Sequence, residues 1–202
     1  MHDPRIDQLA RQLVRHSTSL KRGERVLLDL FDVPEEVGIA LVREARARGA
    51  EPFVHTQSNR VLRELWSGAT EGQMAAYARH RLAEMKDMDA YIAVRGSHNI
   101  SELGDVPQAR MNLVTKHMRK VVNHRVNKTK WCVLRWPHPA MAQQAGMSTG
   151  AFEDFFFRLY QVIPVDFALP WNQKNKASGS QKTKFKVTAE TLRAQRKPNE
   201  DK

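Results

Sequence analysis

The polar segment RGSHNISE, residues 95–102, holds the side chains best suited to bind a ligand. It follows an apolar run that predicts a buried strand, and Gly96 would let the backbone approach a ligand closely. The next apolar run also ends in an arginine. Open α/β sheets bind ligands beyond the carboxyl ends of their parallel strands, where these side chains would meet. The candidate residues are Arg95, Ser97, His98, Asn99 and Arg135. Two interpretations stay open: an anion or carboxylate site, or a polar loop that caps the following helix.

Common metal-binding patterns are missing from the sequence, which has no HExxH, no CxxC and no two histidines four residues apart. His117 and His124 lie seven residues apart among basic residues of a predicted helix, which favours surface positions. His138 stands between two prolines and is interpreted as a hydrogen-bonding loop residue. Cys132 lies inside a predicted strand, so we expect a buried, inert thiol. We therefore assign no catalytic residue and no metal ligand.

Apolar and amphipathic segments alternate between residues 4 and 162. Apolar runs predict strands over 26–31, 51–57, 88–96 and 129–136. Helical periodicity predicts helices over 4–18, 34–48, 60–67, 71–86, 106–127 and 139–162, the last as one helix or two, with Ser148 or Thr149 as a cap. Side chains expected to face inward on the helix over 106–127 are Met111, Val114, Met118, Val121 and Val122. The pattern predicts an α/β fold, with an open, mostly parallel sheet of about four strands and flanking helices.

An aromatic segment, FEDFFF, closes the periodic part of the chain at residues 152–157. Phe152, Phe155 and Phe156 recur at helical spacing and predict a core-facing stripe. Phe157 would then face elsewhere and would need a partner surface, from a second domain or from a second subunit of a homodimer.

Residues 163–202 lose the periodicity and are rich in Lys, Gln, Asn, Ser and Thr, which predicts a disordered tail. Residues 171–202 carry nine basic and three acidic side chains, a large part of the net charge of +11. We therefore expect an α/β domain over residues 1–162 and a basic tail over residues 163–202. No apolar run is long enough to cross a membrane, and the charged first residues are unlike a secretory signal, so we expect a cytoplasmic location.

The segment RWPHPAMAQQAGMSTGAFEDFFFRLY, residues 135–160, resembles the join between the N-terminal and catalytic parts of the thermophilic metallo-aminopeptidases, the aminopeptidase T and aminopeptidase S group. The segments LKRGERVLLDL, VRGSHNISELGDV and LGDVPQARMNL extend the resemblance back toward the first helix. The resemblance implies the N-terminal α/β domain of an enzyme that acts on peptide substrates. In that family a separate catalytic domain supplies glutamate, histidine, tyrosine and aspartate ligands to two divalent metal ions.

Ligands of that kind would lie downstream of the Phe-rich helix, where this chain departs from the family pattern and becomes lysine-rich. We therefore expect a truncated aminopeptidase that binds no metal and is inactive on its own. A frameshifted gene and a genuine short protein would both produce this pattern. Two alternatives remain: a small α/β module whose basic tail binds nucleic acid or another polyanion, and a docking subunit for a full-length homologue.

Overall fold

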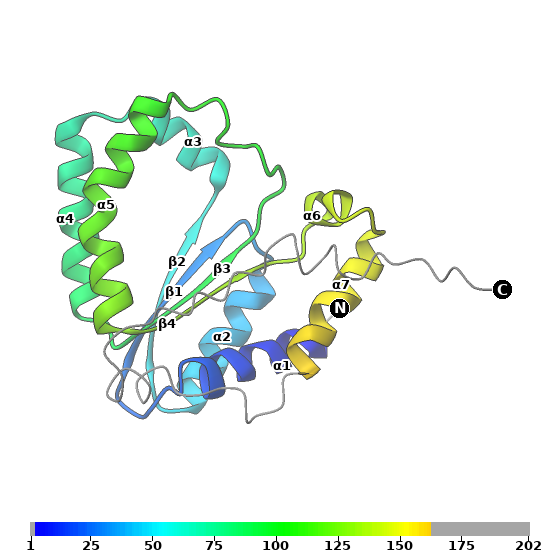
Figure 1. The fold of residues 1–202 in the computed structure, drawn as a ribbon. Helices are drawn as coiled ribbons and strands as arrows, with labels where there is room; N and C mark the ends of the chain where they lie inside the picture. Colours follow the sequence, from blue (N-terminus) through cyan, green and yellow to red (C-terminus); the bar gives the residue numbers. More distant parts are fainter. Residues whose placement is uncertain (1–2, 163–202) are drawn as a thin grey trace, which may run out of the picture.

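The central sheet of the computed structural model contains parallel strands in the order β2-β1-β3-β4 (Figure 1). The strands are β1 (Arg25–Phe31), β2 (Glu51–Gln57), β3 (Ala90–Arg95) and β4 (Lys130–Arg135). The structure describes residues 3–162, and within this range the predicted α/β fold with an open parallel sheet is confirmed. The strands predicted over 88–96 and 129–136 are slightly shorter in the structure. The predicted disordered tail lies outside the described residues.

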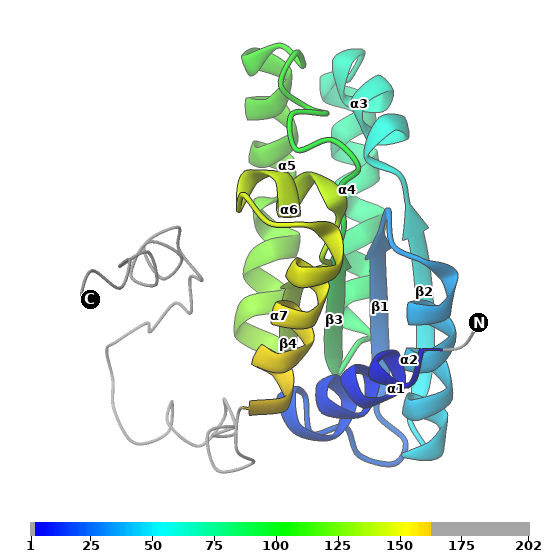
Figure 2. The same cartoon turned by 90° about the vertical axis from the view of Figure 1, so that its right-hand side faces the viewer.

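Helices cover both faces of the sheet (Figures 1 and 2). One face carries α1 (Pro4–Arg11), the π-helical turn η1 (Gln12–Ser17), α2 (Glu35–Ala47) and α7 (Thr149–Val162); the other carries α4 (Glu71–Lys86) and α5 (Gln108–Lys128). α3 (Asn59–Ser67) follows the carboxyl end of β2, and α6 (Pro139–Gln144) connects β4 to α7. The predicted helix over 4–18 is therefore α-helical only in its first part. The segment 139–162 forms two helices, and Ser148 caps the second because its Oγ accepts a hydrogen bond from the Ala151 N–H at 3.3 Å.

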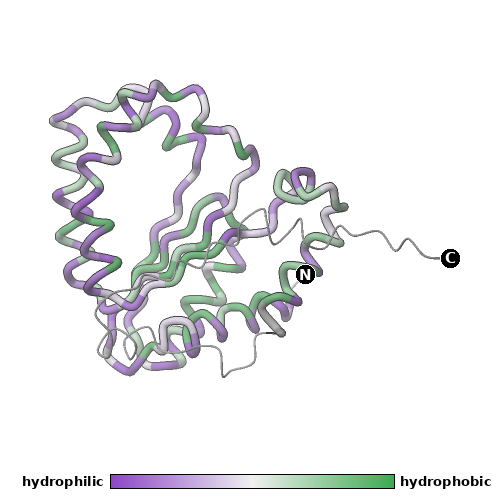
Figure 3. Tube along the Cα trace, viewed as in Figure 1, coloured by the Kyte–Doolittle hydropathy of each residue, from purple (hydrophilic) through white to green (hydrophobic). Residues whose placement is uncertain are grey.

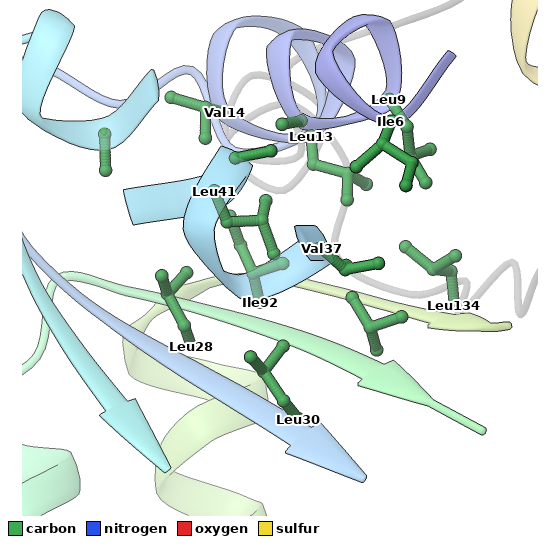
Figure 4. Close-up of a cluster of buried hydrophobic side chains, with 14 of the residues drawn as sticks. Ile6, Leu9, Leu13, Val14, Leu28, Leu30, Val37, Leu41, Ile92 and Leu134 are labelled. Atoms are coloured by element: carbon green, nitrogen blue, oxygen red, sulfur yellow. The ribbon is translucent and has the colours of Figure 1, made fainter. Parts of the chain in front are cut away.

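The larger core lies between the sheet and the helices α1, η1 and α2 (Figure 4). Leu28 and Leu30 of β1 and Ile92 of β3 meet Val37 and Leu41 of α2 there. Each such leucine stabilises the fold by about 2 kcal/mol through its removal from water. β1 and β3 are buried along most of their length because they occupy the middle of the sheet. Figure 3 shows the same concentration of apolar residues along the central strands.

A smaller core lies under α4 and α5, where Leu27 and Tyr91 of the sheet contact Met85 and Val121. The prediction that Val122 also faces inward is wrong, because its side chain is 40% exposed. α5 packs mainly against α4 and has fewer contacts with the sheet. The distance between these two helices and the sheet increases toward the carboxyl ends of the strands (Figure 1). Val122 follows Val121, which faces the sheet, so its side chain points about 100° away around the helix and lines an open cleft rather than the core.

The prediction that Phe157 faces away from the core is also wrong. Its side chain is 5% exposed and makes edge-on contacts with Trp136 at 6.0 Å and Phe156 at 5.3 Å between ring centroids. The guanidinium of Arg5 lies 4.5 Å from the centre of its ring. α7 folds back on α1, so the partner surface of Phe157 is the chain's own first helix. None of the helices within residues 3–162 is long and apolar enough to cross a membrane.

Candidate functional site at the strand ends

The segments that follow β1, β3 and β4 meet beyond the carboxyl ends of these strands, where Gly96 is enclosed by Asp32 and His138. The Gly96 N–H donates to the Phe31 carbonyl at 2.8 Å, and the His138 ring donates from Nε2 to the Asp32 carbonyl at 2.6 Å. A β-carbon on residue 96 would lie 2.3 Å from the Asp32 carbonyl oxygen and 2.5 Å from His138 Nε2. Glycine therefore permits a close approach here, as the sequence predicts, but to the chain's own backbone and histidine. His138 is the hydrogen-bonding loop residue that its setting between prolines indicates.

The polar loop after β3 divides into residues that face a cleft and residues that stabilise the loop. The Ser97 hydroxyl donates to the Asn99 carbonyl, and Asn99 Oδ1 accepts from the Ser101 N–H at 3.0 Å. His98 is exposed, and its ring contacts that of His138 with 4.5 Å between centroids. The loop does not cap the following helix, because the N-cap position of α5 is Pro107 and no side chain caps it within residues 3–162.

The cleft has a volume of about 730 Å³ and lies between the carboxyl half of the sheet, the helices α3, α4 and α5, and the loop after β3. The structure brings four of the predicted residues to its lining, namely Arg95, Ser97, Asn99 and Arg135. His98 is not among the lining residues. Three arginines missed by sequence reasoning, Arg81, Arg119 and Arg125, also line the cleft. Helical periodicity alone does not distinguish a cleft-facing arginine from a solvated one.

The floor of the cleft holds a buried polar network around Asp29, which is 3% exposed in the middle of β1. Its carboxylate accepts from the Tyr91 hydroxyl at 2.7 Å, from Gln57 Nε2 at 2.5 Å and from Arg81 Nη2 at 3.4 Å. Burial, followed by the charge and hydrogen bond of Asp29, raises the pKa of Tyr91 to about 12. An acidic residue inside the otherwise apolar run VLLDLF is the sequence signal that could have identified this network.

A metal site is not supported by the geometry of the described residues. No three His, Cys, Asp or Glu side chains gather within residues 3–162. His55 Nε2 lies 2.8 Å from Glu84 Oε1, but the positively charged Arg81 already contacts both side chains. Burial raises the pKa of the Cys132 thiol to about 11, as expected for an inert cysteine. These residues do not fit a catalytic metal, and we derive no step through one.

The spacing Gly-x-Ser-x-Gly, which marks the nucleophile elbow of many hydrolases, occurs as GMSTG at residues 146–150. That elbow requires a strand before the serine and a helix after it. Here the segment joins α6 to α7, and the Ser148 hydroxyl caps α7. The serine therefore has a structural role in the helix start.

Comparison with known proteins identifies the family. The model of the thermophilic metalloprotease family (M29) matches residues 2–201, nearly the whole chain and beyond Tyr160, where the resemblance seen in the motifs ends. The chain belongs to this family. The expected resemblance to the thermophilic metallo-aminopeptidases is thereby confirmed at the level of a metallopeptidase family. No curated protein sequence matches this chain.

Among solved structures, wild-type AmpT from Thermus thermophilus has the same fold, with a TM-score of 0.62 and 18% sequence identity. The match covers 81% of this chain and 44% of AmpT, so the matched part spans less than half the length of that protein. The CurK enoyl reductase is similar only at a TM-score of 0.31 and 14% identity, over 77% of this chain and 49% of that one. A likeness that weak carries no argument about fold or function.

Proposed function

We propose that this chain forms the N-terminal α/β part of a metal-dependent aminopeptidase and has no peptidase activity on its own. The observation that carries the assignment to a metal-dependent peptidase is the M29 family match over residues 2–201. The 44% coverage of AmpT supports a division of labour in which peptide hydrolysis depends on residues beyond this fold. The family match does not favour a polyanion-binding module.

The family's metal chemistry belongs, on this proposal, to a catalytic domain outside the described fold. Two divalent metal ions would activate water for attack on the first peptide bond of a substrate. Residues 3–162 hold no suitable group of ligands, so we assign them no step of that reaction. Docking of the chain to a full-length homologue, or to a second copy, stays a prediction.

An activity assay on the 202-residue chain tests the proposal directly. The purified chain would be incubated with leucine p-nitroanilide and added Zn²⁺, Co²⁺ or Mn²⁺, with and without EDTA. We expect no EDTA-sensitive release of nitroaniline and less than one equivalent of bound metal after dialysis. Metal-dependent release that follows the protein through purification would overturn the proposal of inactivity.

The coding DNA after codon 160 gives a second, independent test. We expect another reading frame there to continue into a segment that contains Glu, His, Tyr and Asp ligands. Joining that frame to codon 160 should give a longer protein whose hydrolysis of leucine p-nitroanilide is abolished by EDTA. If no frame continues, the frameshift explanation is wrong and the 202-residue chain is the normal product of the gene.

A further inference from the structure

Buried hydrogen-bond donors without acceptors collect along one cleft. The buried N–H groups that lack a hydrogen-bond partner among the described residues include Trp66 Nε1, Arg81 Nε, Arg95 Nε and Arg125 Nε. All four residues line the 730 Å³ cleft at the strand ends. Arginine and tryptophan side chains donate and do not accept. The cleft lining is thus rich in donor side chains, which a ligand with acceptor oxygens would complement.

The arginines of the cleft differ in how their charge is balanced. Arg81 is paired with Asp29 at 3.4 Å and with Glu84 at 3.1 Å. Arg95 and Arg125 have no carboxylate partner among residues 3–162 and instead lie against aromatic rings. The Arg95 guanidinium is 5.2 Å from the centre of the Phe31 ring, and that of Arg125 is 4.8 Å from the Tyr91 ring. Stacking on these rings fixes the orientation of both guanidinium groups.

Arg95 and Arg135 stand side by side at the mouth of the cleft. They are register partners at the ends of the neighbouring parallel strands β3 and β4, so their side chains leave the same face of the sheet. Like charges placed next to each other in a sheet are unfavourable. Arg135 also lacks a carboxylate partner within the described part of the chain. Two adjacent, unpaired arginines are the arrangement that recognises a carboxylate or phosphate group.

The remaining lining adds apolar surface and further positive charge. Five arginines and two carboxylates from the described residues line the cleft, and one of those carboxylates, Asp29, is already paired. Leu62, Trp66, Met111 and Met118 supply apolar surface beyond the arginines. Small-molecule sites typically combine such an apolar lining with a few fixed polar groups.

We propose that this cleft is a binding site for a small organic anion, whose carboxylate or phosphate group binds Arg95 and Arg135 and whose apolar or aromatic part packs toward Trp66 and Met118. The site uses residues of the α/β domain alone and involves no metal. It is separate from the peptide hydrolysis proposed above. Ser97, His98 and Asn99 shape the loop beside it without holding the anion.

Calorimetric titration of the full 202-residue chain tests the proposal with matched probes. The probes are 2-naphthoate, 2-naphthyl phosphate and the neutral 2-naphthamide, all in EDTA so that metal cannot contribute. We expect 2-naphthoate or 2-naphthyl phosphate to bind at least about tenfold more tightly than the amide, because each charged group adds hydrogen bonds to arginine. The stronger of the two anions identifies the head group. Equal binding of all three probes, or binding of none, overturns the proposal.

Single substitutions locate the bound anion. Arg95→Gln and Arg135→Gln should each weaken anion binding at least about tenfold and leave 2-naphthamide binding unchanged. Arg79→Gln is the matched control, because Arg79 is an exposed arginine of α4 that does not line the cleft. If Arg95→Gln fails to fold, the Arg135→Gln variant alone tests the proposal. Arg135 is exposed at the end of an edge strand, so its substitution should not disturb folding. An Arg79→Gln effect as large as the Arg135→Gln effect would show nonspecific charge attraction and overturn the proposal.

Discussion

Asp29 shows how a charged residue is accommodated inside this sheet. Both carboxylate oxygens accept hydrogen bonds, one from Gln57 and the other from Tyr91 and Arg81. A buried carboxylate without such partners would cost several kcal/mol. Its carboxylate is thus held by three partners, which favours a structural role over a catalytic one.

Replacing Tyr91 with Phe should destabilise the fold by about 1–2 kcal/mol at pH 7, because Asp29 loses a buried hydrogen bond. The substitution should also change the pH dependence. The pKa of Tyr91 is about 12 in the folded protein against an ordinary value of 10.0, so the unfolded chain releases this proton first as the pH rises. The contribution of Tyr91 to the free energy of unfolding is fully present below pH 10. It falls by about 3 kcal/mol as the pH rises to 12. Urea denaturation between pH 7 and 12 measures both effects.

Tyr77→Phe provides the control for that series. Tyr77 lines the same cleft and is half-buried, and no hydrogen bond of its hydroxyl is found among the described residues. Its substitution should leave both the stability at pH 7 and the loss above pH 10 unchanged. If Tyr91→Phe loses stability above pH 10 as steeply as the unmodified chain, the assignment of that loss to Tyr91 is wrong.

At the scale of elements, hydrophobic periodicity predicted the strands and most helices because burial dominates those patterns. It failed where tertiary packing overrides the pattern. Val122 has helical spacing appropriate to the core, yet the adjacent Val121 takes the position that faces the sheet, and Val122 points about 100° away around the helix axis. The candidate site was predicted in part. The strand-end position of Arg95 and Arg135 followed from the expected sheet, whereas the contributions of Arg81 and Arg125 depend on how α4 and α5 pack.

Gly96→Ala should destabilise the protein by about 2 kcal/mol, because the added methyl group would overlap Asp32 and His138 where β1, β3 and β4 end. Gly72→Ala is the matched control: nothing lies within 4 Å of the place that its new methyl group would take in α4, and alanine favours helix. That variant should be stabilised by up to about 1 kcal/mol. Thermal unfolding followed by circular dichroism compares the two. Equal melting temperatures would show that the strand ends can relax around residue 96.

At the scale of the whole molecule, the last described helix is held by the first. Arg5 joins them twice, through an ion pair with Asp154 at 2.9 Å and through its position over the Phe157 ring. The exposed ion pair contributes little by itself. The contacts of Phe156 and Phe157 with Trp136 are buried and therefore carry most of the attachment of α7.

Phe157→Ala should consequently lower the free energy of unfolding by about 3 kcal/mol, because it opens a cavity between α1, α7 and Trp136. Leu159→Ala, two residues along the same helix, should cost less than about 1 kcal/mol, since Leu159 is 44% exposed. Chemical denaturation and sedimentation analysis of both variants separate two roles of α7. A large loss of stability with no change in mass supports the intrachain role of Phe157. Unchanged stability with loss of a dimer would instead restore the interpretation of Phe157 as a contact between subunits.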